Sequence, residues 1–199
     1  SPTLDGGARA LSMGGQAPRD VDIIEFVTIP TQGNATDFGN LSVTRTQSAG
    51  LGSRVRGFCT GGMVSPGTYK NEIDFVTFSS TGDATDFGDR TGSIEPSENA
   101  CASRTRAIFA GGEGNTDNID FITIAQTGNA QNFGDLTQSR GAGPGGFSNQ
   151  IRGVFGGGRT PSTVNTIDYI TIAQTGNAVD FGDLTQATQW PGGCSNSIR

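Results

Sequence analysis

Short apolar stretches separated by polar turns recur along the chain. Residues 73–78 read Ile-Asp-Phe-Val-Thr-Phe, in which β-branched and aromatic residues predominate. Successive side chains of a strand point to opposite faces, so Ile73 and Phe75 share one face while Val76 and Phe78 share the other. Apolar residues on both faces predict a strand buried on both sides. The 3.6-residue periodicity of an amphipathic helix is not found.

This stretch is one of three markers that recur in fixed order. The strand-like stretch occurs at residues 24–29, 73–78, 119–124 and 167–172. A glycine-bounded segment follows each copy, at residues 33–39, 82–88, 128–134 and 176–182. An arginine with a glycine pair five and six residues later precedes each copy, at Arg9, Arg56, Arg106 and Arg152. The chain therefore contains four repeats of about 46–50 residues, and a fifth begins at Arg199.

Composition places four short strands in each repeat. In the fourth repeat we expect them at residues 145–149, 152–157, 167–172 and 178–184. Four strands in a repeat of this length is the period of a propeller blade, so the sequence predicts an all-β, four-bladed β-propeller with four antiparallel strands per blade. Residues 1–199 then form a single domain, with repeats near 1–50, 51–99, 100–146 and 147–193 and a closing or overlapping strand at 194–199.

The two ends of the chain offer the same element twice. Residues 190–199 repeat the first strand of a blade and enter the second, while residues 1–8 provide a weaker first strand. A repeat array is stable only when its ends are closed or capped. Either the tail completes the first blade and seals a four-bladed ring, or the chain is a segment of a longer array.

The connections between strands differ in how much they vary. The turn from the third to the fourth strand has the same length in every repeat. The connections from the second to the third strand, and from the fourth strand to the next repeat, differ in length or content. In an up-and-down blade these variable connections share one side, and loops on a rigid scaffold commonly carry recognition. The alternative is that nothing constrains these loops. The binding-face candidates are Arg19, Asp20, Arg45, Tyr69, Lys70, Glu95, Arg140, Arg159 and Trp190.

An acidic residue in the third strand and an arginine in the second strand recur in each repeat. Because neighbouring antiparallel strands bring side chains together, we expect cross-strand ion pairs with a structural role. The candidates are Arg9, Arg56, Arg106 and Arg152 with Glu25, Asp74, Asp120 and Asp168.

Acidic and amide residues also flank the phenylalanine of each fourth strand, as at Asp86 and Asp89. Such oxygen groups can ligate calcium, but acceptance of backbone N–H groups in turns is the favoured interpretation. We predict no metal and no cofactor.

Composition removes several function classes. The sequence has no histidine, which excludes a Ser-His-Asp triad and histidine metal sites. The net charge is −6 and the arginines are dispersed by the repeat, so nucleic-acid binding is not expected. The three cysteines lack metal or disulfide spacing and are predicted to be small core residues. No apolar run is long enough for membrane insertion, and no targeting segment is visible.

The repeat resembles a known family. The order Leu136-x-x-x-Arg140, the glycine pair after residues 151–155 and the Asn-Thr-Ile-Asp-Tyr of residues 165–169 resemble the kelch motif. The tryptophan of an ordinary kelch blade is absent, and a phenylalanine stands in its position. Residues 119–136 and 167–185 are similar to repeats of virion structural and tail-fibre-like proteins of marine bacteriophages, including cyanophages. The resemblance to the kelch motif covers nearly the whole chain.

The resemblance implies a non-enzymatic, extracellular virion component with a kelch-like β-propeller. Such a module presents loops to a host-surface glycan or protein receptor, or assembles with other virion proteins or further copies of itself. One alternative is a kelch-like oxidase, against which the absence of histidine and the presence of only two tyrosines argue. Another is a cellular protein-binding kelch propeller, although no adaptor domain accompanies the repeats.

Overall fold

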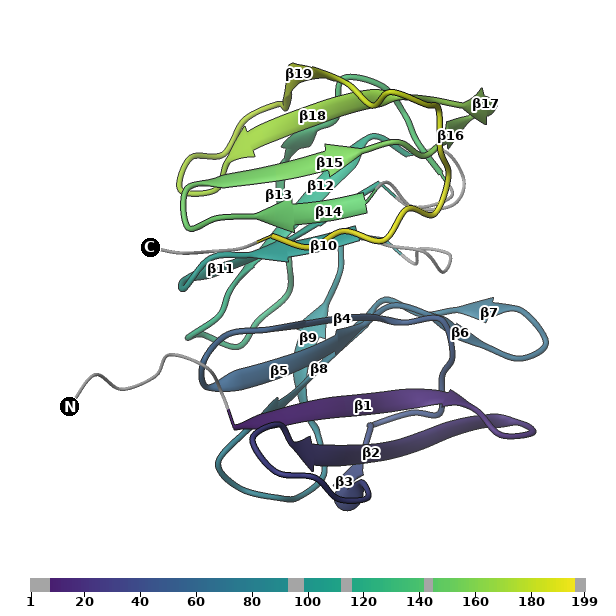
Figure 1. Ribbon diagram of the computed structural model, residues 1–199, viewed down its shortest axis with the longest axis vertical. Coiled ribbons are helices and arrows are strands. Elements are labelled where there is room, and N and C mark those ends of the chain that lie inside the picture. Colours follow the sequence, from purple (N-terminus) through teal and green to yellow (C-terminus); the bar gives the residue numbers. More distant parts are fainter. Residues whose placement is uncertain (1–7, 93–98, 112–115, 142–144, 196–199) are drawn as a thin grey trace.

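The protein folds into successive antiparallel sheets arranged in the order of the chain (Figure 1). The computed structural model describes residues 8–92, 99–111, 116–141 and 145–195. Strands, turns and bends account for the regular structure of these ranges, which contain no helix. The predicted all-β class is confirmed.

Each repeat forms one sheet of three or four strands. The first sheet has the order β1 (Arg9–Gln16), β2 (Asp20–Thr28), β3 (Thr36–Asn40). The second has the order β4 (Ala49–Gly52), β5 (Arg56–Thr60), β8 (Glu72–Thr77), β9 (Thr85–Asp89). The third has the order β10 (Asn99–Ala102), β11 (Arg106–Ala110), β12 (Asn118–Thr123), β13 (Gln131–Asp135). The fourth has the order β14 (Gly145–Ser148), β15 (Arg152–Gly156), β18 (Thr166–Thr171), β19 (Val179–Asp183), close to the predicted bounds.

Two small hairpins interrupt the pattern, and the sequence analysis did not anticipate them. They are β6 (Met63–Val64) with β7 (Thr68–Tyr69), and β16 (Arg159–Thr160) with β17 (Ser162–Thr163). Both lie in the variable connection between the second and third strands of a sheet. Each of their strands has two residues, which is too short to show a periodicity in the sequence.

A β-bulge interrupts the pairing of the last two strands in every sheet. In the second sheet Ile73 pairs with Gly88 and Asp74 with Asp86, which leaves Phe87 as the extra residue. A bulge bends its strand and redirects the side chain. The equivalent extra residues are Phe38, Phe133 and Phe181. The phenylalanine and glycine that recur in each fourth strand therefore have a structural cause.

The hydrophobic core lies between successive sheets rather than within one of them. One cluster joins Ile24 and Phe38 of the first sheet to Val76 of the second. A second cluster joins the second sheet to the third, and a third cluster joins the third sheet to the fourth. Each sheet therefore buries its apolar surface against its neighbour, as expected of a repeat array.

The two ends of the array differ from its interior. The first sheet has three strands in the described part of the chain, and β1 pairs with β2 alone. Beyond the fourth sheet, the described tail runs along β14, where the Ser195 hydroxyl donates to the Ser148 carbonyl at 2.6 Å. The expected closing strand at 194–199 falls largely outside the described residues.

Candidate binding face

The variable connections lie together on one side of the molecule, as predicted. The turn from β1 to β2 and the two small hairpins all project toward the right of Figure 1, while the short turns between β4 and β5 and between β14 and β15 lie at the left. Backbone pairing confirms the grouping, because Thr46 pairs with Met63, and Gly141 with Arg159. We call this the variable-loop side, formed by residues 17–19, 41–48, 61–71, 157–165 and 185–191.

Neighbouring repeats also touch through these loops. The Ser65 hydroxyl of the β6–β7 connection donates to the Asp20 carboxylate of the first sheet at 3.1 Å, and the Ser65 backbone N–H donates to the same carboxylate. Asp20, a predicted binding-face residue, therefore joins two successive loops, and its carboxylate is engaged by Ser65. Such contacts hold the loop edges in a fixed relation to one another.

Two of the predicted binding-face residues are not on the surface. Arg45 and Arg140 are both 0% exposed. Arg45 forms an ion pair with Asp74, and Arg140 forms the equivalent pair with Asp168. Each guanidinium also donates to two backbone carbonyls. The prediction that these two arginines bind a partner is wrong, because both are buried and paired with aspartates inside the protein.

These buried pairs form a recurring structural device. In each pair, the third-strand aspartate binds an arginine from the connection that enters its sheet. A hydroxyl group of the same connection also donates to the aspartate: Ser42 donates to Asp74 at 2.8 Å, and Thr137 donates to Asp168. Burial lowers the pKa of the Arg140 guanidinium, and the charge of Asp168 opposes that shift. The spacing of Leu41 to Arg45, repeated from Leu136 to Arg140, was the signal for this role.

The third sheet obtains the same pairing from a different position. Arg90 lies 3.3 Å from Asp120, and both side chains are fully buried. Arg90 occupies the repeat position of Leu41 and Leu136, which is four residues before the position of Arg45 and Arg140. No spacing rule could have found it, because only the fold brings Arg90 to the same acid.

The second-strand arginines do not form the predicted cross-strand ion pairs. Arg56 is opposite Thr77, whereas Asp74 is opposite Cys59, so the two charges are out of register. Each arginine instead lies over the aromatic ring of the third strand, at 4.5–4.7 Å from its centroid, and Glu25 is exposed. These four cation–π pairs are Arg9 with Phe26, Arg56 with Phe75, Arg106 with Phe121 and Arg152 with Tyr169.

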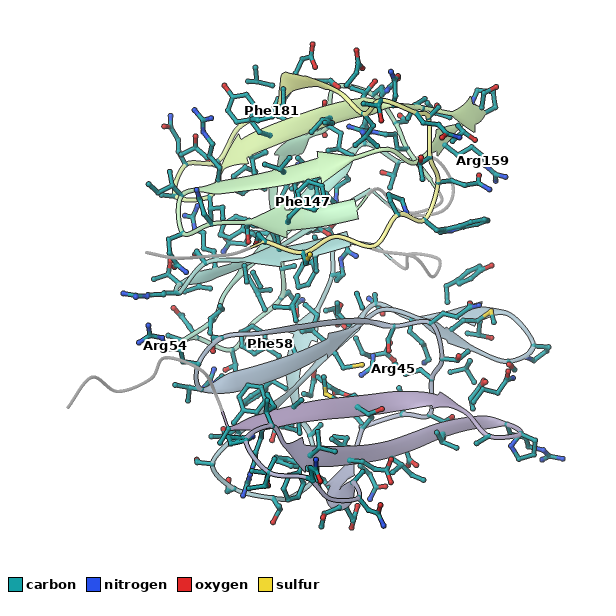
Figure 2. All side chains as sticks on the ribbon, viewed as in Figure 1. Arg45, Arg54, Phe58, Phe147, Arg159 and Phe181 are labelled. Atoms are coloured by element: carbon teal, nitrogen blue, oxygen red, sulfur yellow. The ribbon has the colours of Figure 1, made fainter. Side chains whose placement is uncertain are left out.

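The remaining candidates form an exposed or half-exposed set on the variable-loop side. Arg159, the first residue of β16, projects into solvent (Figure 2), and Arg19 is exposed in the turn after β1. Tyr69 is half-buried in β7. Lys70 contacts Glu72 at 2.9 Å. Burial raises the pKa of Glu72, but the hydrogen bond and charge of Lys70, together with backbone hydrogen bonds, outweigh burial and lower the pKa. Glu95 lies outside the described residues.

Trp190 is the largest exposed side chain on this side. It is 59% exposed and has a φ of 52°. Gln47, two residues after Arg45, has a similar φ of 59° in the equivalent connection. A bulky residue in the left-handed region costs roughly 1–2 kcal/mol. The repeat thus imposes this conformation, and at Trp190 it leaves a large aromatic ring more than half exposed.

The aspartates beside the bulges act as hydrogen-bond acceptors. Asp86 accepts the Gly88 N–H at 2.9 Å, and Asp180 accepts the Gly182 N–H at 3.0 Å. This is the turn interpretation favoured from the sequence. In the described part of the chain, no three or more cysteine, aspartate or glutamate side chains are grouped so that they could hold a metal ion.

An open groove of about 1430 Å³ lies apart from the variable-loop side. Its walls come from β4, β10, β14 and the described tail, and also from Arg9 and Ile29 of the first sheet. Glycine, alanine and serine line much of it. These small side chains leave room between the inner strands but bring no cluster of chemically reactive groups.

The cysteines divide into two buried residues and one exposed residue. Cys59 and Cys101 are core residues as predicted, whereas Cys194 is exposed in the tail, so the core prediction is wrong for Cys194. Burial raises the pKa of the Cys101 thiol to about 12, while a hydrogen bond with Ser148 acts in the opposite direction.

We expect iodoacetamide at pH 8 to label only Cys194 in the folded, dilute protein, because alkylation requires an accessible thiolate. Peptide mass spectrometry would locate the label, and guanidinium chloride should expose all three cysteines. Fast labelling of Cys101 without denaturant would contradict the described burial.

Comparisons with known proteins do not name a family. The sequence matches no protein-family model, and no curated protein is significantly similar to it. Within the described residues, no helix has the length and apolarity needed to cross a membrane.

Proposed function

We propose that this chain is a non-enzymatic virion module, a kelch-like β-propeller segment of a phage tail fibre or related appendage. In this proposal the variable-loop side recognises a glycan on the host surface. The inter-sheet cores form the rigid scaffold, and the loops at its edge provide the chemistry of recognition. The phage origin rests on the resemblance of the repeats, and localisation to the virion follows from it.

The observation that carries the proposal is the ring of Trp190, which is 59% exposed on the variable-loop side. An aromatic face pairs with the apolar face of a sugar ring, and exposed arginines of the same side, such as Arg19 and Arg159, can donate to sugar hydroxyls. The connection before Trp190 is anchored at Thr188, since Gly158 donates to the Thr188 carbonyl at 2.8 Å and Thr188 donates to the Val164 carbonyl at 3.1 Å. A binding residue fixed in this way loses little freedom when a ligand binds.

Trp190→Gly separates binding from stability. We expect glycan binding to weaken roughly 10- to 100-fold, since a central aromatic contact is typically a binding hot spot. We expect folding stability to be unchanged or to rise by about 1 kcal/mol, because glycine relieves the left-handed backbone. Binding is measured on an array of marine bacterial O-antigens and capsular polysaccharides, and stability by thermal unfolding.

Two variants serve as controls for this experiment. Trp190→Phe keeps an aromatic face and should retain most of the binding. Ile151→Ala removes a side chain that is 65% exposed in the short turn between β14 and β15, and should leave binding unchanged. Equal binding by wild type and Trp190→Gly would rule out Trp190 as the platform.

A further inference from the structure

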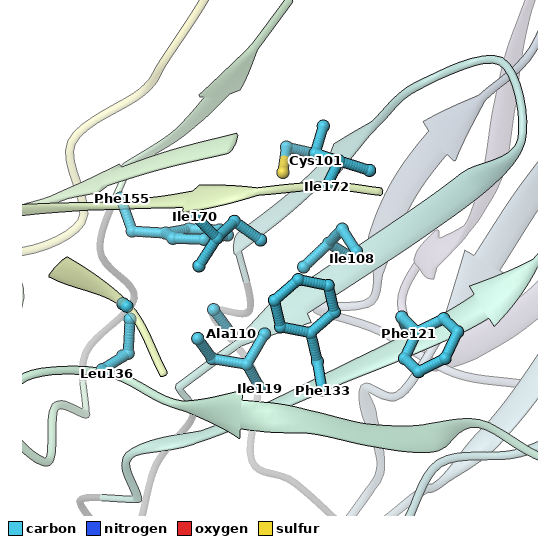
Figure 3. Close-up of a cluster of buried hydrophobic side chains, with 11 residues drawn as sticks. Cys101, Ile108, Ala110, Ile119, Phe121, Phe133, Leu136, Phe155, Ile170 and Ile172 are labelled. Carbon is cyan, nitrogen blue, oxygen red and sulfur yellow. The ribbon is translucent and has the colours of Figure 1, made fainter. Parts of the chain in front are cut away.

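The interior junctions between sheets share one set of contacts, which defines what a complete junction contains. The bulge residues Phe38, Phe87 and Phe133 are each 2% exposed between two sheets. Figure 3 shows this packing for the third and fourth sheets, where Phe133 and Ile170 point into the same cluster. After each bulge a glycine contacts the next repeat so closely that an added Cβ would lie 2.4–2.6 Å from the following glycine.

Backbone hydrogen bonds complete each interior junction. Gly82 donates to the Phe38 carbonyl at 2.7 Å, Gly128 donates to the Phe87 carbonyl at 2.7 Å, and Gly176 donates to the Phe133 carbonyl at 2.8 Å. The second-strand arginine of one sheet also donates to the end of the next third strand, as Arg106 does to the Ile172 carbonyl at 2.9 Å. Each junction thus combines an apolar contact with directional polar ones.

The outer face of the fourth sheet carries one half of such a junction without its partner. Phe181 is 54% exposed and lies at the edge of the molecule in Figure 2. Gly182 keeps the close-approach glycine, but an added Cβ there would meet nothing within 4 Å. Arg152 is exposed and stacks on Tyr169. In the described chain, no following sheet offers Arg152 the carbonyl that Arg106 finds.

The first sheet carries the other half. Val27 is 39% exposed, whereas the equivalent residues Val76, Ile122 and Ile170 are 2–4% exposed. Ile29 is 63% exposed, whereas its equivalents Ile124 and Ile172 are 1–6% exposed. Gly33 and Ala35 occupy the repeat positions whose backbone N–H groups donate to the preceding sheet at every interior junction.

We propose that the first sheet of a second copy docks on the fourth sheet, in the register of the interior junctions. The exposed Phe181 would then pack beside the second copy's Val27, and Arg152 would donate to the second copy's Ile29 carbonyl. A single apolar residue on a surface is common and needs no explanation. Here, however, the fourth sheet exposes one half of a junction and the first sheet exposes the complementary half, so the two faces fit each other. The interface is heterologous, and it produces a ring or a filament depending on its rotation.

A second copy satisfies these faces without altering any interior junction. Within one chain, the three interior junctions leave both end faces exposed, and the tail lies across the open groove from Arg9 and Ile29. Closing the chain on itself would require those packed junctions to change their geometry. Packed interfaces resist continuous deformation, so the structure favours association over self-closure.

Complementation tests the proposal directly. Ile29→Asp blocks the first-sheet end, and Phe181→Asp blocks the fourth-sheet end. We expect wild type to associate as its concentration rises in sedimentation velocity, and each variant alone to remain monomeric. An equimolar mixture of the two variants retains one intact end of each kind, so we expect it to form a 1:1 dimer that grows no further.

Further variants cover the outcome in which a charged substitution disturbs folding. Val27→Asp and Gly182→Ala block the same two ends, and far-UV circular dichroism reports whether each variant is folded. Ile151→Asp should associate as wild type does, because the equivalent residue Val55 stays 60% exposed although its sheet lies between two interior junctions. Wild type that stays monomeric at every concentration, or a mixture that forms no dimer, would overturn the proposal. Monomeric wild type that Phe181→Asp strongly destabilises would identify self-closure instead.

Discussion

Gly134→Ala is expected to destabilise the protein by about 3–5 kcal/mol. An added Cβ would lie 2.4 Å from the Gly176 carbonyl oxygen and 2.5 Å from the carbonyl carbon. Both are backbone atoms within a packed junction, so neither can move aside cheaply. The φ of 151° at Gly134 adds backbone strain. Thermal unfolding followed by circular dichroism measures the effect.

Gly182→Ala is the matched control, because the residue has the same place in its repeat and a φ of 133°. No atom lies within 4 Å of its added Cβ, so only the backbone strain of about 1 kcal/mol remains. The comparison is made in dilute solution, where the chain is expected to be monomeric. Equal losses for the two variants would show that junction contact does not set the stability of the sheets.

Arg140→Met is expected to cost about 3–5 kcal/mol of unfolding free energy, because it leaves the Asp168 carboxylate buried without its cation. Asp168 is 0% exposed, and Thr137 would be its remaining side-chain partner. The substitution also removes two donors to backbone carbonyls, those of Gly157 and Thr166. Chemical denaturation measures this loss.

Arg152→Met provides the control for charge removal at an exposed arginine of the same sheet. It gives up a cation–π contact with Tyr169 and should cost about 0.5–1 kcal/mol. The double variant Arg140→Met with Asp168→Asn removes both charges and should recover part of the loss. An Arg140→Met variant no less stable than Arg152→Met would contradict the structural role assigned to the buried pair.

Repetition made much of the fold predictable. Four copies of one strand-like stretch located every third strand, and the constant turn after it located every fourth strand. The grouping of the variable loops on one side followed from strand order alone. These features depend on local composition and alternation, which a single sequence displays directly.

The side-chain interaction partners were harder to predict from the sequence. In the pairing of β5 with β8, Arg56 is opposite Thr77, three residues from Asp74, and Asp74 instead pairs with Arg45 of a buried connection. Arg45 sits in a variable polar loop, and only the tertiary fold places it in the interior. Arg90 reaches Asp120 from a different position in its repeat. Long-range contacts of this kind depend on the packing of one sheet on the next, which spacing does not encode.

Hydrogen exchange in the presence of marine cyanobacterial envelope fragments tests the recognition claim most directly. We expect ligand-dependent protection of amides in residues 61–71, 157–165 and 185–191 on the variable-loop side. The short turns on the opposite side, at residues 79–82, 125–128 and 173–176, should exchange equally with and without the fragments. Protection confined to those short turns, or none anywhere, would contradict a host-binding role for the variable-loop side.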